Sequence, residues 1–400
     1  MSLLDRLQAF SQKHAISENN SVTPLSAVTK QLYSPTEGEV NGKPAILLGT
    51  NNYLGLTFDN ACTEAGKKAI DQYGTGTTGS RLANGSYDGH KSLEQDLAEF
   101  YGVDHAVVFS TGYTANLGMI SALVGHGDTI MLDEHCHASI YDGCKLSGAN
   151  IIHFRHNNAA DLEKRLRRLG DEIANTLIIV EGIYSMLGDR GNLKDICEVK
   201  QRYDALLMVD EAHSLGVLGG SGRGLAQESG VEALVDFTTG TFSKSLAGIG
   251  GFCVSHHPEL EVIRYTSRPY IFTASPSPAT IATTKQALAI ISSRPQLREQ
   301  LWKNAHQLYA GLAELGYELS PEISPVIAVN ANTQENAMSM WTQLFEQGVY
   351  VNMVLPPATP GSRCLLRCSL SAAHTSAQIE RVILAFANLQ ELPMLKQQIA

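Results

Sequence analysis

Between residues 60 and 260, seven short β-rich runs alternate with helical patterns, and this alternation constrains the fold more than any other feature. Two of the runs, TLIIVE and LLMVD, stay apolar up to a final acidic residue, which is typical of strands covered on both faces. The seven runs are residues 105–110, 129–133, 151–154, 176–181, 206–210, 237–240 and 252–255. Because strands separated by helices form βαβ units, we predict an α/β fold with a mainly parallel seven-stranded sheet.

A change of pattern near residue 290 predicts a second, smaller domain. Two long helical patterns cover residues 276–316, and shorter strand-like and helical segments follow them to residue 390. We therefore expect three parts: an N-terminal segment (1–55), a large domain (56–289) and a small α+β C-terminal domain (290–400). The first 50 residues lie outside the main alternation and could pack with either domain.

Composition narrows the class of protein. Hydrophobic residues make up 44% of the 400, the formal net charge is −10, and no long run of Lys or Arg occurs, which argues against a nucleic-acid or anionic-membrane partner. The seven cysteines are odd in number, widely spaced and without a C-x-x-C pair, so reduced thiols fit better than a disulfide framework. No apolar stretch is long enough to span a membrane, and residues 1–14 resemble an amphipathic helix rather than a signal peptide. We expect a cytoplasmic enzyme without a transmembrane span.

Two motifs carry chemistry that we discount. The GTGTTG segment (74–79) matches a dinucleotide-binding pattern, but a helical pattern precedes it where a strand is required. The segment DEHCH (133–137) holds ligand-type side chains, but neighbouring strand residues point to opposite faces, so we expect no metal site.

Asp210 and Lys244 indicate a more specific chemistry. Asp210 ends an apolar run, and a carboxylate buried there needs a positive partner such as a protonated ring nitrogen. Lys244 follows the next strand, lies among the hydroxyls of Thr241 and Ser243, and is itself followed by glycines. A lysine in a partly desolvated pocket can form a Schiff base, and hydroxyls suit a phosphate group. Together these residues indicate pyridoxal 5′-phosphate as the cofactor.

Motifs spread over nearly the whole chain resemble those of the α-oxoamine synthases, which are fold-type I pyridoxal-phosphate transferases. They are NNYLGL (51–56), GTGTTGSRLANGSYDGH (74–90), FSTGYTANLG (109–118), HASIYDG (137–143), EGIYSMLGD (181–189), VDEAHSLGVLG (209–219), GTFSKS (240–245), RPYIFTAS (268–275) and PPATP (356–360). Within the family the chain is most similar in these motifs to soluble bacterial members that use serine.

The resemblance implies a role for each of several residues. Lys244 would bind the cofactor aldehyde and remove the substrate Cα proton, and Asp210 would pair with the pyridine nitrogen. His213 would reach the phenolic oxygen, with help from Ser185, and His137 would stack on the ring. The phosphate would be held by Thr241, Ser243 and the amides of Gly112 and Tyr113, while Thr273 and Ala274 would reach the phosphate of a neighbouring subunit. Asn52 and Arg367 would bind the substrate, with Arg367 holding its carboxylate.

The implied reaction is a decarboxylative condensation of an L-amino acid with an acyl thioester in a homodimer with shared active sites. Serine and a long-chain acyl-CoA would give 3-ketosphinganine, CO2 and CoA. The alternative within the class uses glycine or alanine, with another acyl-CoA or an acyl-carrier protein as donor. A non-catalytic partner subunit is the alternative from another class, and the presence of Lys244, Asp210 and His213 argues against it. One departure affects the substrate: Leu355 stands where serine-using and 8-amino-7-oxononanoate-forming members carry an Arg.

Overall fold

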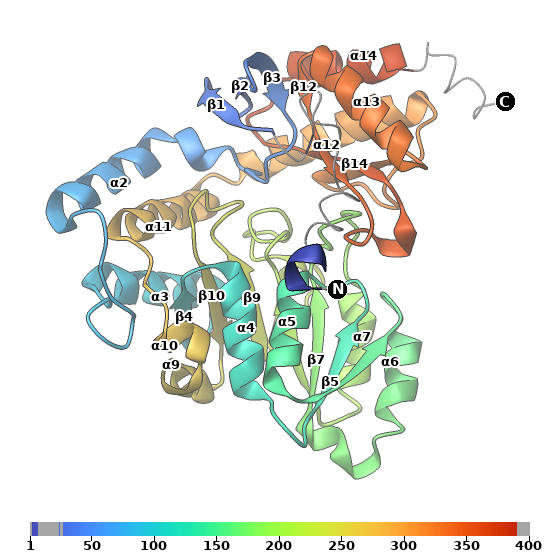
Figure 1. Cartoon of the computed structure of the whole chain (residues 1–400). Coiled ribbons are helices and arrows are strands. Elements are labelled where there is room, and N and C mark those ends of the chain that lie inside the picture. The colour runs from blue at the N-terminus through green and yellow to red at the C-terminus, as the bar shows by residue number, and fades with distance from the viewer. Residues whose placement is uncertain (1, 7–23, 25–26, 390–400) are drawn as a thin grey trace.

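Seven strands form the central sheet in a computed structural model of the protein, which describes residues 2–6, 24 and 27–389 (Figure 1). These strands are β4 (His105–Phe109), β5 (Thr129–Asp133), β6 (Asn150–Phe154), β7 (Thr176–Glu181), β8 (Leu206–Asp210), β9 (Phe237–Thr241) and β10 (Gly251–Ser255). Their order is β4-β10-β9-β8-β7-β5-β6, and only β10 runs antiparallel to its neighbours. The predicted strands and the mainly parallel sheet are confirmed.

Side chains alternate along these strands and pack into two separate apolar clusters, one on each face of the sheet. On β7, Leu177 and Ile179 belong to one cluster, whereas Ile178 and Val180 belong to the other, as the two-residue period of a strand requires. The first cluster packs under α4 (Gly112–Leu123) and α5 (Ala138–Ser147). The second packs under α3 (Asp88–Tyr101), α6 (Ala159–Leu166) and α7 (Leu193–Lys200). Helices therefore cover both faces, which explains the continuously apolar runs.

The remaining helices complete the large domain and form much of the small one. They are α2 (Asn60–Tyr73), α8 (Leu225–Glu228), α9 (Ile263–Thr266), α10 (Arg268–Ile271), α11 (Pro278–Ser293), α12 (Gln296–Glu314), α13 (Gln334–Glu346) and α14 (Ser376–Leu389). Helix α2 precedes the GTGTTG segment, and α11 lies alongside α2 and α3 (Figure 1). No helix in the described part of the chain is long and apolar enough to cross a membrane.

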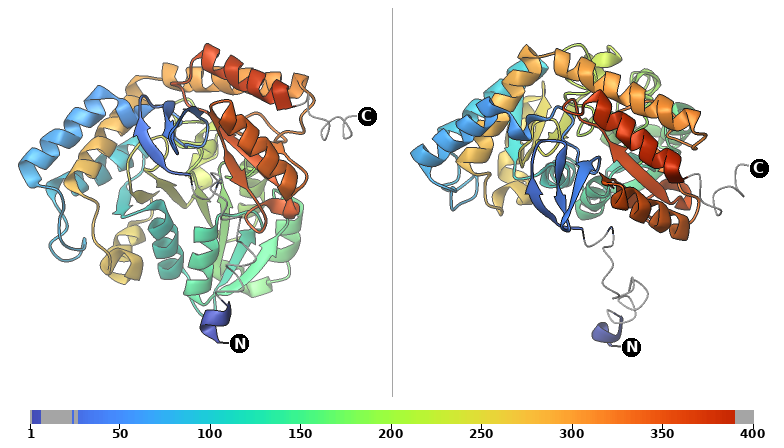
Figure 2. Two further views of the ribbon diagram at one scale, coloured as in Figure 1. Left: turned by 45° about the horizontal axis from the view of Figure 1, so that its top comes forward. Right: turned by 90° about the horizontal axis from the view of Figure 1, so that it is seen from above.

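The N-terminal strands join the C-terminal part of the chain, which settles the choice left open above. Strands β1 (Thr29–Leu32), β2 (Glu37–Val40) and β3 (Lys43–Leu47) form one sheet with β12 (Val349–Tyr350), which runs parallel to β3. A neighbouring sheet has the order β11 (Val326–Asn330), β14 (Leu365–Ser369) and β13 (Asn352–Val354). Figure 2 shows the blue strands beside the red helices, above the large sheet. The predicted amphipathic helix of residues 1–14 lies mostly outside the described residues, and the three-part division stays a prediction.

Candidate active site

A cavity of about 290 Å³ opens where the carboxyl ends of β8 and β9 meet the N-terminus of α4. In open α/β sheets this edge is where ligands bind. The residues that line the cavity include most of those predicted for the cofactor: Gly112, Tyr113, His137, Asp210, His213, Thr241, Ser243 and Lys244. Asn116, Ser139 and Glu181 line it as well, and the sequence analysis did not identify them.

Asp210 lies at the end of β8, where it is 5% exposed and fully hydrogen-bonded. Its Oδ1 accepts from the amide of Ala212 at 2.8 Å, and its Oδ2 accepts from Nδ2 of Asn116 at 2.7 Å. These two donors orient the carboxylate, which can accept from a ring nitrogen in the cavity.

Lys244 follows β9 and has its side chain in the same cavity. Burial, together with the positive charge of Arg367, lowers the pKa of Lys244 to about 8 against the opposing effect of Asp210 and Glu181. A substantial share of the amine is therefore neutral near pH 8, which is the form that attacks an aldehyde.

One end of the cavity has the properties of a phosphate site. The amides of Gly112 and Tyr113 open helix α4, and within the described residues neither has a hydrogen-bond partner. Thr241 Oγ1 and Ser243 Oγ lie 2.9 Å apart beside them. A Cβ added to Gly112 would lie 2.7 Å from the Cβ of Thr241, so only glycine permits this close approach.

His213 lies in the cavity wall, 6% exposed, with its Nδ1 2.7 Å from the hydroxyl of Tyr53. Burial lowers the pKa of His213 well below its usual value, and the charges of Lys244 and Arg367 act in the same direction. The imidazole is therefore neutral, and one of its nitrogens carries a proton that can be donated to an oxygen.

His137 caps the N-terminus of α5 and lines the cavity. Its Nδ1 lies 2.8 Å from the hydroxyl of Ser139, and burial lowers the pKa of the ring. The backbone amide of His137 donates to Oε1 of Glu181. Burial and the charge of Asp210 raise the pKa of Glu181 well above its usual value, and this carboxyl holds the start of α5 through that bond.

Arg367 projects from β14 and is 5% exposed. Its Nε donates to the carbonyl of Ser185 at 2.6 Å, and its Nη1 donates to Oδ1 of Asn51 at 3.1 Å and to Oγ of Ser369 at 2.8 Å. These three bonds come from Nε and Nη1 and hold the guanidinium in place, and Nη2 takes part in none of them. Arg367 is a pre-oriented cation that can receive a carboxylate.

Besides Arg367, four predicted residues lie outside the lining of the cofactor cavity. Asn52 directs its Nδ2 to Thr57 at 2.8 Å, so Asn51 is the asparagine that meets Arg367. Ser185 lines a neighbouring cavity of about 550 Å³ together with residues 357–360, and its carbonyl binds Arg367. Thr273 and Ala274 follow α10, where the carbonyl of Ala274 accepts from Ser110 Oγ at 2.5 Å.

A partly buried histidine between two carboxylates lies close to this neighbouring cavity. His156 bridges two buried carboxylates, with Nδ1 2.9 Å from Asp133 and Nε2 2.6 Å from Asp189. Hydrogen bonds and charge attraction from both raise the pKa of His156 to about 9, against the effect of burial. This contact fastens the 184–189 turn, which carries the Ser185 carbonyl, to the end of β5.

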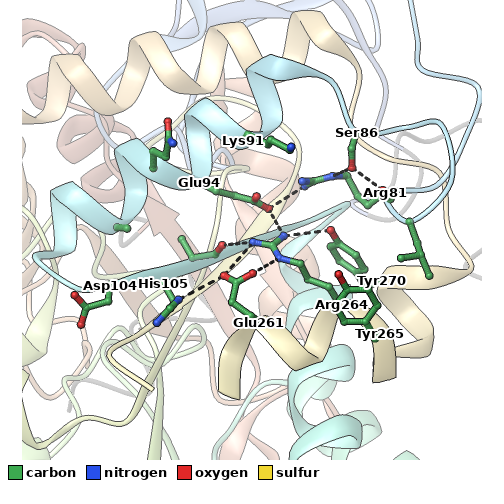
Figure 3. A pocket seen from close by; sticks show the side chains of 14 residues that line it. Arg81, Ser86, Lys91, Glu94, Asp104, His105, Glu261, Arg264, Tyr265 and Tyr270 are labelled. Atoms are coloured by element: carbon green, nitrogen blue, oxygen red, sulfur yellow. Dashed lines mark hydrogen bonds and ion pairs between the residues drawn. The ribbon is translucent and has the colours of Figure 1, made fainter. Parts of the chain in front are cut away.

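A further cavity, of about 540 Å³, lies apart from these groups and is lined by an ion-pair network (Figure 3). Glu94 binds both Arg81, at 3.0 Å, and Arg264, at 2.9 Å, and Arg264 also pairs with Glu261 at 2.7 Å. Each cation therefore has a carboxylate partner. The network joins α3 to the segment that carries α9, and we assign it a structural role.

These observations test whether pyridoxal phosphate fits the cavity. The buried carboxylate of Asp210 matches its ring nitrogen, and the lysine with a lowered pKa matches its aldehyde. The two helix-end amides and the two hydroxyls match its phosphate. Among the described residues, no group of three or more His, Cys, Asp and Glu side chains is arranged to hold a metal. The fold and the site thus define a pyridoxal-phosphate enzyme of fold type I.

Comparison with known proteins gives the family. The family model for aminotransferases of class I and II matches residues 43–386. The chain is 53% identical to the serine palmitoyltransferase of Caulobacter vibrioides, over 97% of this chain and 96% of that one. It is 46% identical to a serine palmitoyltransferase variant from S. paucimobilis solved with a bound PLP–myriocin aldimine, with a TM-score of 0.94 and 98% of each chain covered. The 8-amino-7-oxononanoate synthase of Lysinibacillus sphaericus is 38% identical, over 87% of this chain and 89% of that one. The chain belongs to the α-oxoamine synthases within this aminotransferase family, and its predicted family and cofactor are confirmed.

Proposed function

We propose that the protein condenses L-serine with a long-chain acyl-CoA to give 3-ketosphinganine, CO2 and CoA. The observation that carries this proposal is a buried guanidinium, that of Arg367, close enough to Lys244 to lower its pKa. An amino acid offers one amine, which would displace the Lys244 amine from the cofactor aldehyde, and one carboxylate, which suits the guanidinium of Arg367. The 53% identity to a serine palmitoyltransferase supports serine as the amino acid.

The geometry of the site gives each of its cofactor-binding residues a role. Bound pyridoxal phosphate supplies an electron sink for the carbanion that forms at the substrate Cα. Asp210 would pair with the ring nitrogen, and the amides of Gly112 and Tyr113 would hold the phosphate. Lys244 would hold the cofactor through its aldehyde and, once the amino group of the substrate has displaced it, would take the Cα proton as a free amine.

The remaining residues hold the substrate. Arg367 binds the amino-acid carboxylate through the face that Asn51 and Ser369 leave free, and His137 covers the ring plane. We also propose that the chain forms a homodimer in which Thr273 and Ala274 reach the partner's phosphate, and that it is cytoplasmic. The position of both residues outside their own cavity supports the shared-site arrangement.

A second candidate is the condensation of glycine or alanine with a different acyl-CoA or an acyl-carrier protein. Leu355 is the observation behind it, because this position lacks the cation that serine-using members carry, although 8-amino-7-oxononanoate-forming members carry that cation too. The side chain of Leu355 packs against the apolar core of the small domain, so no positive charge is available from this position.

Product analysis distinguishes the two candidates. Purified holoenzyme is incubated with serine, glycine or alanine and with acyl-CoAs of graded length, and products are identified by mass. We expect 3-ketosphinganine-type products from serine with C16 donors. Turnover of glycine or alanine in preference to serine would replace this proposal with the second candidate, and no product with any pair would refute both.

A further inference from the structure

Tyr53 is the only residue of the N-terminal segment whose side chain reaches a group of the cofactor cavity among the hydrogen bonds of the described residues. Its side chain is completely buried. Its amide donates to the carbonyl of Asn51 at 2.9 Å, and its carbonyl accepts from Ala372 at 2.7 Å. The ring is therefore held by the small-domain side of the molecule while its hydroxyl lies against His213, a residue of the large domain.

The distances around this hydroxyl favour one direction of hydrogen bonding. The Tyr53 oxygen lies 2.7 Å from Nδ1 of His213 and 3.5 Å from Oδ1 of Asn51. That Asn51 oxygen already accepts from Arg367 and from Ser369, at 3.1 and 3.2 Å. A 2.7 Å contact is a normal hydrogen bond, whereas 3.5 Å is at its limit. The hydroxyl proton thus points at His213.

Protonation states agree with this direction. Burial raises the pKa of Tyr53 to about 12, so the hydroxyl keeps its proton. Burial and nearby cations lower the pKa of His213, so its ring is neutral and has one N–H and one acceptor nitrogen. If Nδ1 accepts from Tyr53, the ring proton lies on Nε2.

We propose that Tyr53 is a positioning residue that holds His213 in the tautomer with its proton on Nε2. Because Nδ1 is taken by Tyr53, Nε2 is the ring nitrogen left for the cavity, where it donates to the phenolic oxygen of the cofactor. This second part rests on the proposed cofactor contact of His213. The Tyr53 hydroxyl thereby links the part of the site that binds the amino acid to the hydrogen bond that His213 makes with the cofactor.

The test is Tyr53→Phe, which keeps the buried ring and removes only the hydroxyl. Histidine-selective 15N labelling of the holoenzyme reports the tautomer of each ring, and His213→Gln identifies the His213 signals. We expect an Nε2–H tautomer in the unmodified protein, a mixture of tautomers in Tyr53→Phe, and about 5- to 10-fold weaker cofactor binding, the scale of one hydrogen bond. Tyr317→Phe is the matched control, since its hydroxyl donates to Phe386 at 2.8 Å, remote from the cavity, and should leave both readouts unchanged.

Two results would overturn the proposal. An Nδ1–H tautomer in the unmodified protein refutes it whatever the variant does, and so does a Tyr53→Phe holoenzyme with unchanged tautomer and cofactor affinity. Failure of the proposed function has a different signature. In that case the unmodified protein makes no product from serine, while Tyr53→Phe still changes the His213 tautomer.

Discussion

Asn116 donates from Nδ2 to Oδ2 of Asp210 across 2.7 Å, while its own Oδ1 accepts from Thr239 Oγ1 at 2.9 Å. The asparagine belongs to α4 and the aspartate to β8, so this contact joins the helix that offers free amides to the strand that offers the carboxylate. Asn116 is 3% exposed.

Asn116→Ala should weaken cofactor binding by roughly 10-fold or more, because a bond to a charged group is lost and the Asp210 carboxylate is left partly unpaired. Fluorescence titration of the apoenzyme with pyridoxal phosphate measures this. Asn304→Ala is the control: it removes a buried asparagine that bonds the carbonyls of Ser371 and His374 instead. Equal affinity in Asn116→Ala and the unmodified protein would contradict the assigned support of Asp210.

The rate at which the apoenzyme binds pyridoxal phosphate should rise with pH through a midpoint near 8 and level off about one pH unit higher. The neutral amine of Lys244 reacts with the aldehyde, and burial lowers the pKa of that amine to about 8. Stopped-flow absorbance gives the profile, and Lys244→Arg should show no visible absorption band at any pH. A midpoint near 10.5, the usual lysine pKa, would show that the amine is not desolvated.

Arg367→Ala should raise the dissociation constant for serine about 100-fold, the scale of a charge-assisted bond, with cofactor affinity little changed. Asn51→Ala removes one acceptor that orients the guanidinium and should raise the dissociation constant for serine only about 5-fold. Spectral titration of each holoenzyme with serine measures both. Arg363→Ala, an exposed arginine on the loop before β14, is the matched control. Equal serine affinity in Arg367→Ala and Arg363→Ala would rule out the carboxylate role.

Leu355→Arg should lower the KM for serine several-fold, because it adds a cation on the loop that borders the Ser185 cavity. Leu355→Met keeps an apolar side chain against the core and serves as the control for packing. Steady-state kinetics with serine and acyl-CoA varied in turn separate the two substrates. A change confined to the acyl-CoA KM would assign the position to the donor instead.

The free energy of unfolding should fall between pH 6.5 and about 9 by roughly 3 kcal/mol through His156 alone. Its folded pKa is raised, so its contribution is complete below the unfolded value of 6.5 and is lost as pH rises through about 9. Denaturant unfolding at several pH values measures the slope, which His156→Gln should flatten. The exposed His256, which pairs with Asp104, provides His256→Gln as a control that keeps the slope.

Sequence patterns predict the central sheet well for a physical reason. Strands that are buried on both faces are continuously apolar, and β7 and β8 follow this rule. The acidic residue that ends each apolar run therefore marks the end of the strand. The partner of the N-terminal strands was not predictable, because β12 has two residues and pairs with a strand some 300 positions earlier. Short pairs of this kind carry no periodic signal.

Some residues of the site could be predicted from the sequence and others could not. Asp210 and Lys244 follow strands and are visible in the sequence, because a strand end is a defined place in space. Asn116 lies in mid-helix and Asn51 in a loop, and whether either meets Asp210 or Arg367 depends on contacts between segments far apart in the chain. The resemblance implied Asn52 in the NNYLGL segment; its amide turns to Thr57, and Asn51 is the asparagine that meets Arg367.

The parallel pairing of β3 with β12 ties the chain leading into Asn51 and Tyr53 to the domain that carries Arg367. A protein trimmed to begin at residue 56 would keep the residues that line the cofactor cavity but lose Asn51, which holds Arg367, and Tyr53, which holds His213. Residues 27–55 therefore support both the amino-acid end and the cofactor end of the site, and a redesign of this segment alters the two together.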